Sequence, residues 1–272
     1  MIGGAIRAVV EREFKRFVRQ RGRLLSTLVR PLLWLVVIGS GYSAIVSDGD
    51  GISYHQYLLP GIFGMVLLFS TMLSALATVH DREFGPIRML LIAPVPRSAI
   101  VWAKTLAATL LGLAQAILFL PLLFFLGIWP GPAALLFFFC GVTLTALALS
   151  SLGMLLASRI RSIEGFAVVM NFVIFPMFFL SGALYPAARL PGWLQPVVRI
   201  NPLTYGIDLM KHALLPDGPG ALGGEFLPAL DVGVLVGFTF VALALAHALF
   251  GREEHLGRIL LAATPLRRKK PR

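Results

Sequence analysis

Residues that could do covalent chemistry are few in this chain and form no catalytic pattern. Lys104-Thr105 is the nearest match to the end of a phosphate-binding loop, but Ala103 stands where that motif has glycine. Five histidines, none with the spacing of metal ligands, are scattered along the chain: His55, His80, His212, His247 and His255. The single cysteine, Cys140, excludes a disulfide within the chain. The sequence therefore predicts no catalytic residue, no metal site and no ATP hydrolysis by the chain itself, which favours transport over enzyme catalysis.

The most informative segment is His80–Arg97, which begins with charged residues and continues into a short apolar stretch. Pro86 can open a new helix, because its fixed φ suits the first turn. Ile87, Leu90 and Leu91 then share one face of that helix. We predict a short amphipathic helix between two apolar segments. Taken alone, the pattern also fits an ordinary interfacial linker.

A second candidate site surrounds Asn171, which lies in a long apolar segment with Phe172, Phe175 and Phe178 close by. A polar group at that depth is costly unless it is paired or hydrated. One interpretation is a substrate-facing stripe on a helix kinked by Pro176. The other is a hydrogen bond between helices, with the phenylalanines facing lipid. The residues alone leave both interpretations open.

The elements that must position these residues are long and apolar. The chain has 272 residues, of which 57% are hydrophobic and 14% charged, and its mean hydropathy is +0.84. A soluble domain of this composition would expose large apolar patches. Six segments suit membrane helices, which need about 20 apolar residues each: residues 32–46, 58–79, 100–128 (interrupted by Pro121), 133–157, 166–184 and 232–250. We predict an all-α, polytopic membrane protein with six transmembrane helices.

The basic residues indicate the orientation. All but three of the 24 Lys and Arg residues lie at the termini or in alternate gaps between the apolar segments, and the exceptions are Arg189, Arg199 and Lys211. Cytoplasmic loops carry the excess of Lys and Arg, so we expect both termini in the cytoplasm. The net charge of +11 then suits anionic headgroups. It does not indicate nucleic acid, because aromatic residues are not interleaved with the basic ones.

Three regions follow from this pattern. Residues 1–30 are expected to form a cytoplasmic, interfacial amphipathic helix, with an apolar face made by Ile6, Val10, Phe14 and Phe17. Residues 31–250 are expected to form the six-span transmembrane domain, with the short amphipathic segment at about 81–97 between its second and third spans. Residues 251–272 form a basic cytoplasmic tail.

The longest outer gap, at about 185–229, is expected to hold re-entrant helices between the fifth and sixth spans. Asn201 followed by Pro202 is typical of a helix start. The helix that follows is predicted to present one apolar face, formed by Leu203, Ile207, Met210 and Leu214. We expect it to lie on or dip into the outer leaflet.

The segment at about 81–97 resembles the coupling-helix region of the type-2 ATP-binding-cassette (ABC) exporter permeases, and we call it the coupling segment. The resemblance is carried by Arg82-Glu83-Phe84-Gly85-Pro86-Ile87-Arg88, then Leu90-Leu91, Ala93-Pro94-Val95 and Arg97. Two positions depart from the family pattern, because Pro86 replaces Thr and Arg88 replaces Glu.

A second block is similar to the signature of the same family around its fifth span and outer helices. It runs from Asn171 to Pro186 and continues through Leu190-Pro191, Trp193-Leu194 and Asn201-Pro202-Leu203-Thr204-Tyr205. Order, spacing and span number all agree, so the resemblance covers essentially the whole chain. The branch that exports drugs and lipo-oligosaccharides is the one it resembles most.

The resemblance implies the membrane permease of an ATP-driven exporter in a bacterial cytoplasmic membrane. Two permease copies would pair, as a homodimer or with a related chain, and two separate ATPase subunits carrying ATP-Mg would dock below. The chain itself would bind no cofactor. The implied ATPase contacts are Glu83, Phe84, Gly85, Pro86, Arg88, Leu90, Leu91, Pro94 and Arg97. The implied translocation path includes Asn171, Phe172, Phe175 and Phe178.

The alternative function is a self-contained secondary carrier or channel. Such a protein uses buried charge pairs for ion coupling, and the sequence places no acidic residue in the interior of an apolar segment. An amphipathic substrate suits the apolar, aromatic path. The residues leave open whether it is a lipid, a lipid-linked or lipo-oligosaccharide, or a drug.

Overall fold

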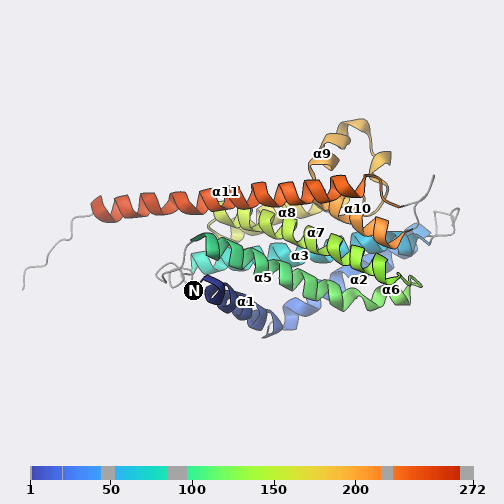
Figure 1. Ribbon diagram of the computed structural model, residues 1–272, viewed down its shortest axis with the longest axis horizontal. Helices are drawn as coiled ribbons and strands as arrows, with labels where there is room; N and C mark the ends of the chain where they lie inside the picture. The colour runs from blue at the N-terminus through green and yellow to red at the C-terminus, as the bar shows by residue number, and fades with distance from the viewer. Residues whose placement is uncertain (1, 20, 44–52, 85–96, 216–222, 264–272) are drawn as a thin grey trace, which may run out of the picture.

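The computed structural model describes residues 2–19, 21–43, 53–84, 97–215 and 223–263, and all its regular elements there are helices. In chain order they are α1 (Ile2–Arg19), α2 (Arg21–Ser43), α3 (Tyr54–Glu83), α5 (Arg97–Phe119), α6 (Pro121–Phe125), α7 (Pro132–Arg159), α8 (Ile163–Phe179), the 3-10 helices η1 (Ala187–Arg189) and η2 (Gly192–Leu194), α9 (Gln195–Ile200), α10 (Pro202–Leu214) and α11 (Pro228–Ala263). The long helices run along the longest axis of the molecule (Figure 1). The all-α prediction is confirmed for this part of the chain.

Four helical stretches among the described residues are long and apolar enough to cross a membrane: Tyr54–Glu83, Ser98–Phe125, Pro132–Arg159 and Pro228–Leu249. Two shorter apolar stretches, Val29–Gly41 in α2 and Ile163–Phe179 in α8, fall at the first and fifth predicted spans. The chain is therefore a polytopic membrane protein.

Some helix ends agree with the predicted ones and others do not. Pro121 separates α5 from α6, as its missing N–H predicts. Helix α8 keeps Pro176 inside it but ends at Phe179, earlier than predicted. The chain turns just beyond this end, at Gly182. Its φ of 76° is readily adopted by glycine but is strained for a residue that has a β-carbon. Helix α11 continues to Ala263, so the region expected to be a tail begins as helix.

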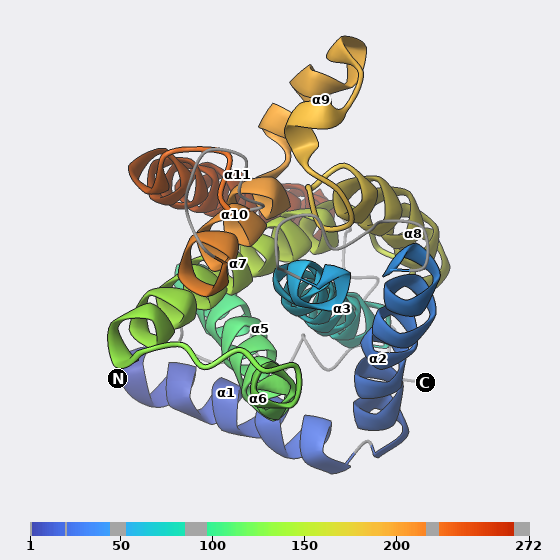
Figure 2. The ribbon, with the colours of Figure 1, turned by 90° about the vertical axis from the view of Figure 1, so that its right-hand side faces the viewer.

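Helix α3 forms the centre of the bundle. It packs against α2, α5, α7, α8 and α10, and Figure 2 shows it enclosed by its neighbours. Its Phe63 is fully buried and meets the ring of Phe138 edge-on, with ring centroids 4.9 Å apart. Between membrane-spanning helices, close packing of such side chains stabilises the bundle, because lipid tails are as apolar as the side chains themselves.

Helix α1 runs across the direction of the other helices, as Figure 2 shows, and Figure 1 places it near the start of α5. It packs mainly against α5 and also against α2. Its buried side is Val9, Glu13 and Phe17, whereas Phe14 is exposed. The predicted apolar face is therefore rotated from the face that packs, because an acidic residue, Glu13, has its partner inside the bundle.

Helix α10 begins where the sequence predicts. The side chain of Asn201 accepts a hydrogen bond from the backbone N–H of Leu203, at 3.1 Å, and Pro202 occupies the first turn. However, every residue from Pro202 to Lys211 is buried, against α7, α11 and α3. The helix therefore lies inside the bundle and not on its surface, and its polar face must find partners within the protein.

Gly206 marks the close approach of α10 to α7, and it gives a first prediction. A β-carbon at this position would lie 2.9 Å from Cβ of Thr145. We expect Gly206→Ala to destabilise the fold by about 1–3 kcal/mol, measured as a lower midpoint of thermal unfolding in detergent. The matched control is Gly233→Ala, where a β-carbon meets nothing within 4 Å. Equal midpoints for the two variants would contradict this packing.

Candidate functional site at the basic end of the bundle

A buried ionic cluster joins three helices at the end of the bundle where α3 and α7 end and α5 begins, which we call the basic end. Lys104 Nζ of α5 donates to Oε1 of Glu13 in α1, at 2.7 Å, and to Oδ2 of Asp81 in α3, at 2.6 Å. The three residues are only 4%, 5% and 3% exposed. We call Glu13, Asp81 and Lys104 the ionic cluster.

Two arginines of α1 complete the charge balance. Arg12 Nη2 lies 3.0 Å from both Oδ2 of Asp81 and Oε1 of Glu13, and Arg16 Nη1 lies 3.2 Å from Oδ1 of Asp81. Each carboxylate therefore has at least two cationic partners. Buried charges are tolerated only when they are paired in this way, so the cluster fixes α1 against α3 and α5 in one arrangement.

Glu13 is charged at neutral pH despite its burial. Burial alone raises the pKa of a carboxyl group, but Lys104 and Arg12 outweigh it and hold the pKa of Glu13 below its ordinary range. Because the folded pKa is lower than the unfolded one, the interaction stabilises the fold above an unfolded pKa of about 4.3. That stabilisation is lost as the pH falls through the folded pKa.

A second prediction follows from the lowered pKa of Glu13. Between about pH 5 and pH 3, the unfolding midpoint of the wild type should fall more steeply than that of Glu13→Gln, which cannot take up the proton. Thermal unfolding in detergent at a series of pH values measures both slopes. Glu11→Gln, at an exposed carboxylate of the same helix, should keep the wild-type slope. Parallel curves for wild type and Glu13→Gln would refute the assignment.

The last turn of α3 also holds the connection between α7 and α8. Arg82 Nη1 donates to the backbone carbonyls of Ala157, at 2.7 Å, and Ser158, at 3.1 Å. Glu83 Oε2 accepts the backbone N–H of Ile163, at 2.8 Å. Carbonyls at a helix C-terminus and N–H groups at a helix N-terminus lack partners within the helix. Arg82 and Glu83 thus join α3 to two further helices.

The predicted coupling residues lie between these anchors. Phe84 follows α3, is 65% exposed and has its ring centroid 4.6 Å from that of His80. Gly85, Pro86, Arg88, Leu90, Leu91 and Pro94 lie outside the described residues, and so does the side chain of Arg97, which begins α5. The structure therefore places both ends of the predicted coupling segment at the basic end.

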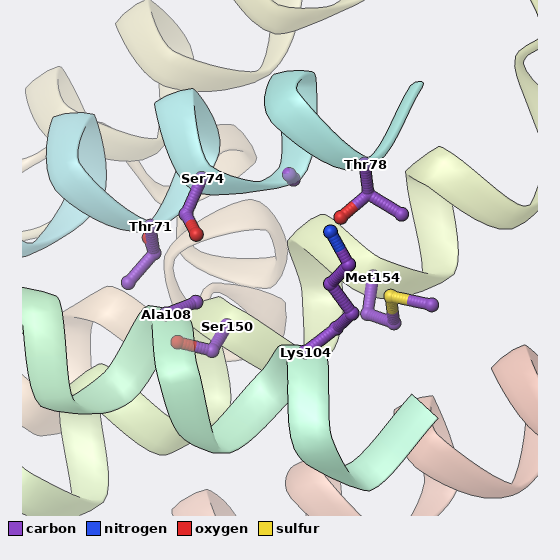
Figure 3. A pocket seen from close by; sticks show the side chains of 8 residues that line it. Thr71, Ser74, Thr78, Lys104, Ala108, Ser150 and Met154 are labelled. Atoms are coloured by element: carbon purple, nitrogen blue, oxygen red, sulfur yellow. The ribbon is translucent and has the colours of Figure 1, made fainter. Parts of the chain in front are cut away.

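A small polar hollow lies beside the cluster, between α3, α5 and α7. Figure 3 shows Lys104 directed towards Thr78, with Thr71, Ser74 and Ser150 around the hollow. The space open to the centre of a water molecule is about 10 Å³, close to what one buried water needs. Sites for drug-sized ligands are far larger, about 300–1,000 Å³. The hollow can hydrate the cluster, but it cannot hold an amphipathic substrate.

The residues predicted for the path separate into two groups. Asn171 and Phe175 are exposed and Phe172 is 76% exposed, so they point away from the rest of the chain. Phe178 is 2% exposed and packs edge-on against Trp34 of α2, with ring centroids 5.6 Å apart. Phe178 therefore joins α8 to α2 inside the chain, and only the other three lie on an outer face.

Sequence reasoning missed the partners of Lys104. The signal was visible, because an ionisable residue inside an apolar segment calls for a buried partner. Asp81 lies in the last turns of α3, and Asp231 lies buried in the first turn of α11. Both acidic residues lie just outside the predicted apolar segments 58–79 and 232–250, and they are buried because both helices extend beyond those segments.

Similarity to known proteins covers most of the chain. The ABC-2 type transporter family matches residues 4–215. Nodulation protein J of Rhizobium meliloti (strain 1021) is 30% identical over 240 residues, which are 85% of this chain and 86% of that protein. The putative transport permease ycf38 of Porphyra purpurea is 31% identical over 212 residues, covering 76% and 72%. The inner membrane transport permease YadH of Escherichia coli (strain K12) is 27% identical over 269 residues, covering 93% and 96%.

Proposed function

Because this chain belongs to the ABC-2 type transporter family and is a membrane permease, we propose that ATP hydrolysed on a separate subunit drives its transport of an amphipathic substrate. Two ATPase subunits dock at the basic end, against the segment from Glu83 to Arg97. The membrane is the bacterial cytoplasmic membrane, in keeping with the name of the Escherichia coli relative.

The observation that carries this proposal beyond family membership is the set of links around the coupling segment. The ionic cluster fastens the end of α3 to α5 and α1, and Arg82 and Glu83 fasten it to α7 and α8. A displacement of the coupling segment by an ATPase would therefore reach five helices at once. Such rigid connections are what a motor outside the membrane needs in order to change a permease between two states.

The proposed topology has six spans with both termini in the cytoplasm. Helices α2 and α8 supply the first and fifth spans beside the four longer ones. Helix α1 then lies in the cytoplasmic headgroup layer, and its crosswise orientation supports this placement (Figure 2). Residues 185–229 form the outer re-entrant segment.

The proposed path lies on the outer face formed by α2 and α8, against the second permease copy. Val36 and Val37 of α2 are exposed, as are Asn171, Phe172 and Phe175 of α8. An apolar, aromatic surface with one amide suits a lipid, a lipid-linked or lipo-oligosaccharide, or a drug. Phe178 lies on the inner side of α8, where its ring packs against Trp34 of α2.

Cysteine cross-linking tests where the ATPase docks. Cys140 is the only cysteine, so Cys140→Ser gives a background for Phe84→Cys at the basic end. Trp193→Cys on η2 is the control, because the two native side chains are similarly exposed, at 65% and 77%. With the cognate ATPase subunit co-expressed, a short thiol cross-linker should join the ATPase to the Phe84→Cys chain alone. An ATPase adduct at Trp193→Cys, or at neither position, would overturn the proposed docking.

A further inference from the structure

Three chemistry-bearing side chains meet at the opposite end of the bundle, far in the sequence from the coupling segment. Asp208 and His212 lie one turn apart on α10, and Asp231 lies in the first turn of α11. One ligand atom of each, a carboxylate oxygen or a ring nitrogen, lies within 4.8 Å of the others. Asp208 and Asp231 are both buried, so two carboxyl groups this close together need either a bound cation or a shared proton.

Asp208 already has partners in the protein. Its Oδ1 accepts the backbone N–H of Glu225, at 2.7 Å, and its Oδ2 accepts that of Phe226, at 2.9 Å. These bonds fix the carboxylate at the start of the connection to α11. Each carboxylate oxygen can accept more than one bond, so Asp208 keeps the capacity to bind a cation.

Asp231 is the unexplained member of the group. The residue is 0% exposed, and as a carboxylate it accepts no hydrogen bond from the residues that the structure describes; the side chain it faces is the carboxyl group of Asp208, to which it can bond only if one of the two is protonated. A buried polar group without a partner is rare and requires an explanation. The buried cation of this region, Lys211, is engaged elsewhere, since its Nζ lies 3.0 Å from the hydroxyl of Tyr57 and 4.0 Å from Oε1 of Glu225.

We propose that Asp208, His212 and Asp231 form a zinc site that joins α10 to α11. Two carboxylates and an imidazole are ligands that zinc accepts, and three protein ligands with a water complete its tetrahedron. Histidine favours zinc over calcium or magnesium, which prefer oxygen ligands.

The three ligand atoms lie within 4.8 Å of one another, so binding an ion would require the side chains to move closer together. Ligand atoms of a tetrahedral site with bonds of about 2.0–2.1 Å lie about 3.3 Å apart, and Nε2 of His212 is 3.6 Å from Oδ2 of Asp208. The same Nε2 lies 2.9 Å from the carbonyl of Phe226, so binding through it would replace that contact. The ion would neutralise Asp231 and connect the buried helix α10 directly to the start of α11.

Metal analysis of the full-length chain in detergent tests the site. The protein is purified with a tag that contains no histidine, from cells grown with zinc, and bound zinc is measured by mass spectrometry. We expect about one zinc per chain in the wild type and at least a tenfold lower content in His212→Gln and Asp231→Asn. The control His247→Gln changes an exposed histidine of α11 and should keep the wild-type zinc content.

A second measurement guards against a variant that folds poorly. Zinc added to chelator-treated wild type should raise the unfolding midpoint by about 5 °C in a saturable manner, because a ligand of the folded state stabilises it. His212→Gln should show no such rise, and magnesium should produce none in the wild type. Absence of zinc together with an unchanged midpoint would overturn the site and indicate that the two carboxyl groups share a proton instead. Neither measurement depends on transport or on an ATPase.

Discussion

Replacing Lys104 by methionine should destabilise the folded chain by about 3–5 kcal/mol, because Glu13 and Asp81 would remain buried without their common partner. We expect a large loss of monodisperse protein in detergent and a markedly lower unfolding midpoint. Both are measured by size-exclusion chromatography after heating.

The matched control is Lys15→Met on α1. Lys15 pairs with Glu11 at 2.6 Å, but both side chains are exposed, and exposed pairs contribute only about 0–1 kcal/mol. A triple variant, Lys104→Met with Glu13→Gln and Asp81→Asn, removes all three buried charges and should recover much of the lost stability. If Lys104→Met were as stable as Lys15→Met, the ionic cluster would not hold the helices together.

Glu83→Ala should lower the amount of substrate moved per ATP hydrolysed by about tenfold or more, while the protein still inserts and folds. The reason is the loss of the link between the coupling segment and the first turn of α8. The free energy involved is about 1.5–3 kcal/mol for a hydrogen bond to a charged group, and 1.4 kcal/mol is a factor of about ten. Transport and phosphate release are measured together in vesicles that also contain the ATPase.

Glu83→Gln separates the hydrogen bond from the charge. Its amide oxygen can still accept the N–H of Ile163, so we expect a value between those of wild type and Glu83→Ala. Glu11→Ala removes an exposed carboxylate from α1 and should leave the ratio unchanged. A normal transport-to-ATP ratio in Glu83→Ala would contradict the role of this contact in coupling.

Much of the architecture was accessible from the sequence, because apolar length and local helix signals are local properties. Pro121 separates two helices and Asn201 caps the start of α10, and both effects act through a few neighbouring backbone groups. The periodicity of α1 predicted a helix but not its packed face. An amphipathic pattern shows where apolar residues lie, not whether a charged residue such as Glu13 has a partner in the interior.

The ionic sites could not be predicted in the same way, since their members are far apart in the chain. Glu13 and Lys104 are separated by 91 positions, and Asp231 meets His212 only because α10 is buried beside α11. Lys104 stands inside the predicted apolar segment 100–128, but its partners follow from how α1 crosses the bundle. The path residues show the same limit, because Phe172 and Phe178 lie in one helix yet face opposite environments.

Transport by purified components is the most direct test of whether the energy comes from a second protein. Vesicles containing only this chain should not accumulate a fluorescent amphipathic lipid or drug against its gradient, with or without ATP or an imposed ion gradient. Vesicles that also hold the ATPase subunit should accumulate it when ATP and magnesium are present. Uphill movement by the chain alone, powered by an ion gradient, would show instead that it is a self-contained carrier.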